Sequence, residues 1–361
     1  MDYKGLKGIV AAETRICHID GELGKLIYRG YDVKELTRTY TFEEAAYLLW
    51  YGEFPNMQQL MSLKEEFRRN RYLSDELKSI IKLMPITADF MSVIRTAISA
   101  EGGYGEYHFP PTIDQAIKLT ALIPTVIAFR KRILEGKKEI SPRVDLDHVA
   151  NYLYMLTGEV PQSAPVQALE TYMILTLEHG MNASTFSARV TISTESDMVS
   201  AVTSAIGTMK GPLHGGAPSG VIELLDDIAG KNAEYVIRRK LEKGEKLMGF
   251  GHRVYKTHDP RSVALKMKLQ ELVGQDEWLD LATEVENMVI TLLEEFKPGR
   301  NLYTNVEFYA AAIMKAIGLD ASLFTPTFTA SRIVGWTAHI LEQAEDNVIY
   351  RPQSKYIGPI Y

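Results

Sequence analysis

A histidine set among glycines and prolines is the first group in this sequence that points to chemistry. His214 lies in the segment Lys-Gly-Pro-Leu-His-Gly-Gly-Ala-Pro, residues 210–218. Proline fixes one backbone torsion and glycine opens conformations that other residues avoid, so the segment suits neither a helix nor a strand. We expect a non-repetitive turn that brings His214 close to a ligand. A connector between two helices, with a histidine that is merely hydrogen-bonded, is the structural alternative.

A second histidine follows in residues 247–261, Leu-Met-Gly-Phe-Gly-His-Arg-Val-Tyr-Lys-Thr-His-Asp-Pro-Arg. This segment places His252 near Lys256 and Arg261. It is not a dinucleotide fingerprint, because a third glycine and a preceding strand are lacking. Backbone amides and cations in this arrangement suit an anionic ligand, including a phosphorylated one. A solvated basic loop between two helices is the alternative.

A carboxylate among apolar neighbours is the third candidate. Glu307 lies in Arg-Asn-Leu-Tyr-Thr-Asn-Val-Glu-Phe-Tyr, residues 300–309, near the start of an expected helix. There it can serve simply as a favourable charge at a helix N-terminus. In apolar surroundings the same carboxyl binds its proton more tightly and can act as a base. Taken alone, His179 is more often a packed histidine, and Arg351 is usually a surface charge.

Two other kinds of site find no support in the sequence. The eight histidines show no zinc-ligand spacing, and the single cysteine, Cys17, cannot supply a thiolate site, so no metal site is expected. A Gly-x-Ser-x-Gly turn is lacking and Cys17 falls in a predicted hairpin. Neither a serine nor a cysteine nucleophile is therefore expected.

The composition limits the classes of partner. The 361 residues include 46 acidic and 40 basic side chains, a net charge of −6, which argues against nucleic acid and anionic membranes as partners. Hydrophobic residues make up 46% and charged residues 24%, the balance of a soluble globular protein. With no secretory signal visible and one cysteine, a cytoplasmic location is expected. Basic clusters at residues 68–71 and 130–132 are expected on solvated faces.

Helical patterns must position these groups. A β-hairpin is predicted over residues 14–29, and a capping box of Thr41 and Glu44 opens the first helix. A chain of this length exceeds the usual size of a single core, so two lobes are expected, with breaks at 210–218 and 318–326. The predicted class is almost all-α. Further helices are expected at 57–70, 74–84, 89–100, 112–135, 146–157, 163–178, 182–193, 195–209, 218–229, 232–243, 260–273, 276–296, 305–318 and 327–345.

Taken in order, these segments resemble the citrate synthase family over residues 5–359. Residues 5–14, 20–21 and 28–32 are similar to its N-terminal hairpin region, and residues 211–217, 249–261 and 305–309 to its three catalytic segments. The resemblance implies a homodimer of two-lobed, nearly all-α subunits with a small N-terminal β-hairpin. It also implies a large helical domain formed by residues 1–215 and 319–361, with a small helical domain at 216–318.

The resemblance implies an acyltransferase that condenses acetyl-CoA with oxaloacetate and water to citrate and CoA, without a metal or redox cofactor. On the family pattern, His214 stabilises the enol, His252 polarises the oxaloacetate carbonyl, and Glu307 is the base. The positions that match oxaloacetate contacts are His179, Asn182, Arg261, Arg332 and Arg351, the last of which is expected to reach the neighbouring subunit's site. The positions that match CoA contacts are Met248, Gly249, Gly251, Lys256 and Arg300.

The sequence departs from the family pattern at the base. The family ordinarily has Pro-Asn-Val-Asp where residues 304–307 read Thr-Asn-Val-Glu, so the side chain is one methylene longer and the turn lacks its proline. A displacement of about 1 Å can lower a rate about a hundredfold. Weak synthase activity is therefore expected unless the backbone compensates. Gly180 and Asp89 also depart from the pattern, with no consequence that we can assign.

Two alternative functions stay open at this point. One is a 2-methylcitrate synthase that uses propionyl-CoA, because one methylene in an apolar pocket is worth only about 1 to 3 kcal/mol. The other is a catalytically weakened paralogue that binds oxaloacetate or CoA as a sensor or scaffold. Glu307 favours the weakened paralogue, whereas the complete set of His214, His252 and the arginines favours an enzyme.

Overall fold

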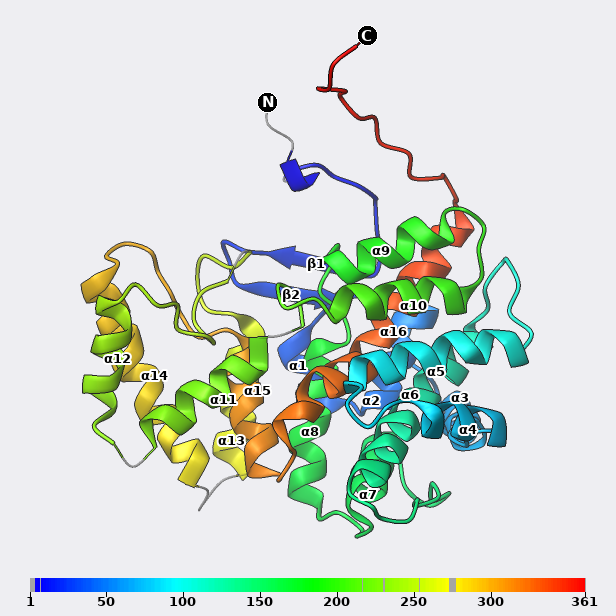
Figure 1. Ribbon diagram of the computed structural model, residues 1–361, viewed down its shortest axis with the longest axis horizontal. Coiled ribbons are helices and arrows are strands. Elements are labelled where there is room, and N and C mark those ends of the chain that lie inside the picture. Colours follow the sequence, from blue (N-terminus) through cyan, green and yellow to red (C-terminus); the bar gives the residue numbers. More distant parts are fainter. Residues whose placement is uncertain are drawn as a thin grey trace.

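Helices make up most of the chain, as the sequence predicted. The computed structural model describes residues 4–6, 8–215, 217–229, 231–252, 254–272 and 277–360. Within those ranges it contains sixteen α-helices and one small sheet (Figure 1). The predicted class, almost all-α with an N-terminal β-hairpin, is confirmed. No helix among the described residues is long and apolar enough to cross a membrane.

The N-terminal sheet has three antiparallel strands, β1 (Cys17–Asp20), β2 (Lys25–Tyr28) and β3 (Tyr31–Asp32). The predicted hairpin is confirmed, whereas the short third strand was not predicted. The Tyr28 hydroxyl donates to the carbonyl oxygens of Glu178 at 2.8 Å and Leu175 at 3.1 Å. In the hairpin turn, Gly21 O accepts from Lys256 N at 2.9 Å. The sheet therefore joins two segments that carry predicted site residues.

Ten helices precede the glycine-rich turn of His214. They are α1 (Val33–Thr39), α2 (Phe42–Tyr51), α3 (Met57–Asn70), α4 (Asp75–Leu83), α5 (Phe90–Tyr104), α6 (Ile113–Leu134), α7 (His148–Thr157), α8 (Ser163–Thr176), α9 (Ala183–Ile192) and α10 (Met198–Met209). All but α1 were predicted, and the predicted capping box of Thr41 and Glu44 is present at α2. The missed helix has only seven residues and is capped by Asp32, whose side chain accepts from Lys34 N.

Helix α16 (Phe324–Glu345) lies in the core of the molecule. Its residues from Phe324 to Ile340 are almost all buried, and it packs against α2, α6, α8, α9 and α10. Gly335 lets the helix lie very close to the chain segment at Leu177 and Glu178. A Cβ at this position would lie 2.3 Å from Leu177 O and 2.4 Å from Glu178 Oε2. Helix α16 therefore rests directly against the segment that leads into His179.

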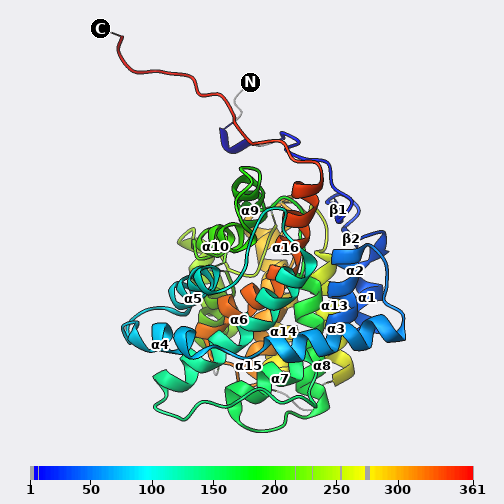
Figure 2. The same ribbon diagram turned by 90° about the vertical axis from the view of Figure 1, so that its right-hand side faces the viewer.

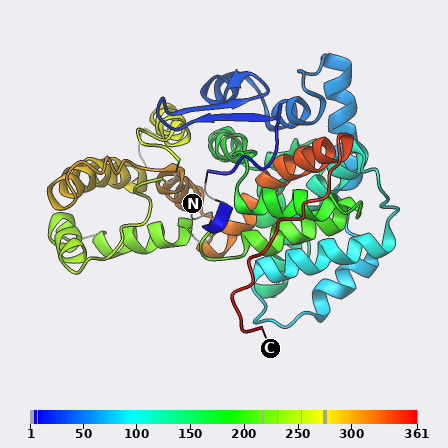
Figure 3. The ribbon, with the colours of Figure 1, turned by 90° about the horizontal axis from the view of Figure 1, so that it is seen from above.

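Five helices between the two predicted breaks gather at one side of the molecule (Figure 1, Figure 3). They are α11 (Ala217–Ile228), α12 (Ala233–Glu242), α13 (Pro260–Leu272), α14 (Glu277–Phe296) and α15 (Val306–Ala316). Contacts of α15 with α11, α13 and α14, and of α12 with α14, hold the group together, and α13 and α15 also pack against α8. The division into domains at 1–215, 216–318 and 319–361 stays a prediction, and residue 216 lies outside the described residues.

The expectation that the basic clusters lie on solvated faces is wrong for one arginine in each cluster. Arg71 is 2% exposed and Arg130 is 1% exposed. The guanidinium of Arg71 donates to Leu146 O at 2.7 Å, and that of Arg130 donates to Ala88 O at 3.3 Å. Backbone carbonyl groups of distant segments accept hydrogen bonds from both buried guanidinium groups, which a pattern of charges along the sequence does not reveal.

Replacing Gly335 with alanine is expected to destabilise the protein by about 1 to 3 kcal/mol, because the added methyl group would overlap the backbone oxygen of Leu177 as well as the buried carboxylate of Glu178. Gly103→Ala is the matched control, since nothing lies within 4 Å of a Cβ at that position in α5. It should leave the stability unchanged or raise it. Urea unfolding followed by circular dichroism measures both variants. Equal stabilities would contradict the close contact assigned to Gly335.

Candidate active site

His214 lies on a non-repetitive turn between α10 and α11, as the sequence predicted. Its backbone N–H donates to Gly211 O at 2.9 Å. The next residue, Gly215, is so closely packed that a Cβ would lie 2.3 Å from Met209 O, and its carbonyl accepts from Thr325 Oγ1 at 2.7 Å. Glycine is the residue that fits there without displacing backbone, and the turn is thereby fixed against α16.

A serine behind His214 holds its ring. His214 Nε2 lies 2.7 Å from Ser184 Oγ, which accepts a hydrogen bond from Trp336 Nε1 at 2.9 Å. Ser184 Oγ donates to Asn182 Oδ1 at 2.8 Å. Asn182 is the N-cap of α9 and already accepts from Thr185 N at 3.1 Å. The predicted substrate position Asn182 therefore acts as a support for the serine.

The imidazole of His214 is neutral near pH 7. Burial, followed by the positive charge of Arg332, lowers its pKa to about 4. A neutral imidazole carries one N–H. The single hydroxyl proton of Ser184 can go to Asn182 Oδ1 or to His214 Nε2, and when it turns to Nε2 the ring proton lies on Nδ1. That N–H then points away from the serine and can donate to a ligand.

The backbone fixes the tautomer of His252. Its Nδ1 accepts from Val254 N at 3.0 Å and from Tyr255 N at 3.2 Å. A nitrogen that accepts carries no proton, so the ring proton lies on Nε2. Burial, followed by the positive charge of Arg261, lowers the pKa of His252 to about 4. His252 is therefore a neutral ring with an N–H donor at Nε2, which lies 3.3 Å from Arg261 Nη2.

His179 belongs to the same group of side chains. Its Nε2 lies 3.1 Å from the Tyr255 hydroxyl, and its ring meets that of His252 edge to face with centroids 5.4 Å apart. Burial, together with Arg261 and His252, lowers the pKa of His179 well below its ordinary value. The structure thus brings two neutral histidines from distant segments into contact.

Two buried arginines make this region positive. Arg261 is 4% exposed and is held by both oxygens of Asp259, Nε to Oδ1 at 3.0 Å and Nη2 to Oδ2 at 2.9 Å. Arg332 is 1% exposed, its Nε donates to Thr176 O at 2.7 Å, and its guanidinium lies 4.7 Å from the centre of the Phe328 ring. In an acidic protein, these two side chains concentrate positive charge where a carboxylate can be bound in a bidentate manner.

Glu307 lies in the first turn of α15, where Asn305 caps the helix by accepting from Glu307 N at 3.1 Å. Burial raises the pKa of its carboxyl to about 7, although the positive charges of Arg261 and Arg332 act in the opposite direction. A carboxyl with this pKa is partly ionised at neutral pH and can exchange a proton with a ligand.

The glycine-rich loop before His252 is bound to the turn before Glu307. Gly249 and Gly251 have φ angles of +87° and +82°, a conformation that favours glycine. Gly249 O accepts from Asn305 N at 2.9 Å, and Gly251 N donates to Tyr303 O at 2.8 Å. Backbone groups that the resemblance assigned to CoA binding are thus engaged in joining this loop to the turn of the predicted base.

The other predicted residues lie at the surface. Lys256 is paired with Glu22, and its side chain is 72% exposed. Arg300 is exposed and Met248 is 37% exposed. Arg351 lies in the exposed tail that leaves the body after α16 (Figure 2). Within one chain, the structure brings His179, His214, His252, Glu307, Arg261 and Arg332 together, but not Arg351.

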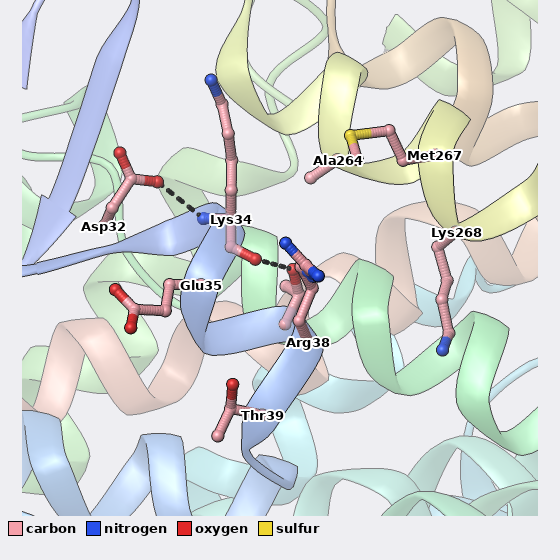
Figure 4. Close-up of a pocket in the computed structure, with 9 residues that line it drawn as sticks. Asp32, Lys34, Glu35, Arg38, Thr39, Ala264, Met267 and Lys268 are labelled. Carbon is pink, nitrogen blue, oxygen red and sulfur yellow. Dashed lines mark hydrogen bonds between the residues drawn. The ribbon is translucent and has the colours of Figure 1, made fainter.

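A cavity elsewhere in the molecule contains none of the predicted site residues. It has a volume of about 590 Å³, lies between α1 and α13, and is lined by charged side chains that include Lys34, Arg38 and Lys268 (Figure 4).

Among the residues that the structure describes, no group of three or more His, Cys, Asp or Glu side chains is placed to hold a metal ion.

Sequence reasoning missed the residues that support the site. Asp259 stands two positions before Arg261, and this short spacing is a signal that a carboxylate accompanies the arginine. Trp336 stands four positions after Arg332 in α16, which places the two on one helix face. Ser184 gave no such signal, because the histidine that it holds lies thirty positions further along the chain.

Comparison with known proteins decides the family. The family model described as "Citrate synthase, C-terminal domain" matches residues 5–353. The chain belongs to the citrate synthase family. It is 40% identical over 365 residues to citrate synthase 2 of Bacillus subtilis, with 99% of this chain and 96% of that protein covered. As a citrate synthase family member, the protein is an acyltransferase.

Two further family members extend the comparison. The chain is 40% identical over 362 residues to a 2-methylcitrate synthase of Mycobacterium tuberculosis, with 98% of this chain and 90% of that protein covered. A solved ternary complex of citrate synthase from Thermoplasma acidophilum with carboxymethyl coenzyme A and oxaloacetate has a TM-score of 0.89 at 29% identity. That match covers 99% of this chain and 97% of the archaeal chain.

The raised pKa of Glu307 predicts a dependence of stability on pH. The pKa rises from an ordinary 4.5 to about 7 on folding, so the stabilisation from the bound proton is present below pH 4.5 and is lost as the pH rises through about 7. Glu307→Gln cannot ionise. Between about pH 5 and about pH 8 its free energy of unfolding should therefore increase relative to that of the parent, by up to about 3 kcal/mol. Urea unfolding at both pH values measures this difference, and a difference that stays constant would contradict the raised pKa.

Proposed function

We propose that the protein condenses acetyl-CoA with oxaloacetate and water to give citrate and CoA. The observation that carries the proposal is the Glu307 carboxyl. Its pKa is about 7, and it interacts electrostatically with the buried Arg261 and Arg332. A base of this kind can remove a proton beside a thioester while the arginines bind a dicarboxylate. The archaeal relative, which was solved with oxaloacetate and a coenzyme A derivative, supports the same pair of ligands.

In the first step, Glu307 removes a proton from the methyl group of acetyl-CoA. The electron pair of the broken C–H bond forms the enol, and negative charge develops on the thioester oxygen. His214 donates its Nδ1–H to that oxygen, which requires Ser184 to donate to Nε2. A donor that is already fixed in place is commonly worth about 3 kcal/mol of barrier.

In the second step, the enol carbon attacks the ketone carbon of oxaloacetate. The new C–C bond forms as the ketone electron pair moves to oxygen, and the Nε2–H of His252 donates a hydrogen bond to that oxygen. The oxygen takes up one proton to become the hydroxyl group, and Glu307 releases the proton that it removed from the methyl group. Arg261 and Arg332 bind the carboxylates in a bidentate manner, and His179 lies beside them. The oxygen of a water molecule then forms a bond to the thioester carbonyl carbon of the bound product, the C–S bond breaks, and a proton of that water goes to the sulfur, so that CoA leaves as the free thiol.

The proposal includes a homodimer. Arg351 in the exposed tail completes the oxaloacetate site of the partner subunit, and the segment from Met248 to Gly251 contacts CoA together with Lys256 and Arg300. The position of Arg351 supports this arrangement, because it lies in an exposed tail and apart from the other predicted site residues of its own chain.

The expected cytoplasmic location stays a prediction.

A preference for propionyl-CoA is the second candidate function. Relatives named citrate synthase 2 and 2-methylcitrate synthase are both 40% identical to this chain, so overall similarity does not separate the two activities. A ligand-binding paralogue with little catalysis is a further candidate, and the glutamate at the position of the base favours it.

A CoA-release assay distinguishes these candidates. With oxaloacetate present, kcat/KM is expected to be about tenfold or more higher with acetyl-CoA than with propionyl-CoA, the range that one methylene commonly gives. A higher value with propionyl-CoA would favour the 2-methylcitrate reaction. If neither substrate releases CoA while oxaloacetate still raises the thermal unfolding temperature, the ligand-binding role is supported instead.

The pH profile tests Glu307 as the base. Because only the ionised carboxylate removes the proton, kcat/KM should rise about tenfold per pH unit below about pH 7 and level off above it. His214 and His252 have pKa values of about 4 and stay neutral across this range. Glu307→Gln should lower kcat at least about a hundredfold and remove the rise. A flat profile in the parent would argue against Glu307.

A further inference from the structure

The turn before Glu307 contains a threonine where the family pattern has proline, and this threonine makes a buried hydrogen bond. Thr304 is 3% exposed, and its Oγ1 donates to Glu286 Oε1 at 2.6 Å. Glu286 lies on α14, eighteen positions earlier in the chain. Proline has no hydroxyl group and cannot form this bond.

Glu286 is a buried carboxylate that accepts from three side chains. In addition to Thr304, the Tyr309 hydroxyl donates to Glu286 Oε2 at 2.6 Å, and Lys266 Nζ pairs with the same oxygen. Burial opposes ionisation, but the hydrogen bonds from Lys266, Thr304 and Tyr309 hold the pKa of Glu286 below its ordinary value. Glu286 is therefore ionised at neutral pH, and both hydroxyl groups act as donors to it.

These bonds fix the chain on both sides of Glu307. Thr304 precedes it by three positions and Tyr309 follows it by two, and both are anchored to one carboxylate on α14. Between them, Val306 N donates at 3.1 Å to Asp259 Oδ2, the oxygen that also accepts from the guanidinium of Arg261. The backbone of Glu307 is thus tied to α14 and to the arginine site.

We propose that Glu286 is a positioning residue for Glu307 and acts through Thr304 and Tyr309. A glutamate carries its carboxyl one methylene further from the backbone than an aspartate does. The bond from Thr304 to Glu286 sets the turn where the longer side chain reaches the acyl methyl group. This is the backbone compensation on which activity with Glu307 was expected to depend. The inference rests on the proposed role of Glu307 as the base.

The test compares Thr304→Val with Thr304→Ser in the full-length protein. Valine cannot donate to Glu286, whereas serine keeps the hydroxyl group. Thr304→Val should lower kcat for CoA release about tenfold or more while KM for oxaloacetate stays within about twofold, because the base moves and the arginines do not. Thr304→Ser should retain most of the parental kcat. This separation of kcat from KM is not expected from a general loss of structure.

Glu295→Gln is the matched control on α14, since Glu295 pairs at the surface with Arg238 at 2.7 Å, and it should have the parental kcat. Thermal unfolding shows whether each variant is folded. If Thr304→Val does not fold, Tyr309→Phe removes the other hydroxyl donor and makes the same comparison. Equal kcat for folded Thr304→Val and Thr304→Ser would overturn the inference while leaving the proposed function intact. A parent protein that releases no CoA would overturn both.

Discussion

The site depends on the contact between α16 and the chain segment that ends in His179. Gly335 lets the helix lie against the backbone at Leu177, where any larger residue would push it away. From this position α16 presents Arg332, and Trp336 donates to the serine that contacts His214. Catalytic groups need to be held to within about 0.5 Å, and a helix buried on all sides meets that requirement better than a surface loop.

The same helix carries a charged network behind the site. Arg189 Nε donates to His339 Nδ1 at 3.0 Å, so the ring proton lies on Nε2, which donates to Glu178 Oε1 at 3.1 Å. Both Glu178 and His339 are fully buried. Separating these partners is costly, because it leaves a buried carboxylate without its hydrogen-bond donor. The network therefore penalises any shift of α16 relative to the residue before His179.

Burial explains the opposite pKa shifts of the candidate site residues. Removing a side chain from water disfavours its charged form, which lowers the pKa of His214 and His252 and raises that of Glu307. One physical cause thus yields neutral histidines that donate hydrogen bonds and a carboxyl that takes up a proton near neutral pH. Arg261 stays charged in the same surroundings because Asp259 is paired with it.

The sequence by itself determined the helices and the three segments that carry His214, His252 and Glu307, because helix caps, periodicity and the torsions of glycine and proline are local properties. It missed α1, which is too short to show a period. Only the tertiary structure decided which side chains support these residues, since Ser184 lies thirty positions from His214 and Glu286 eighteen from Thr304. It also decided the pKa values, because burial depends on neighbours that are remote along the chain.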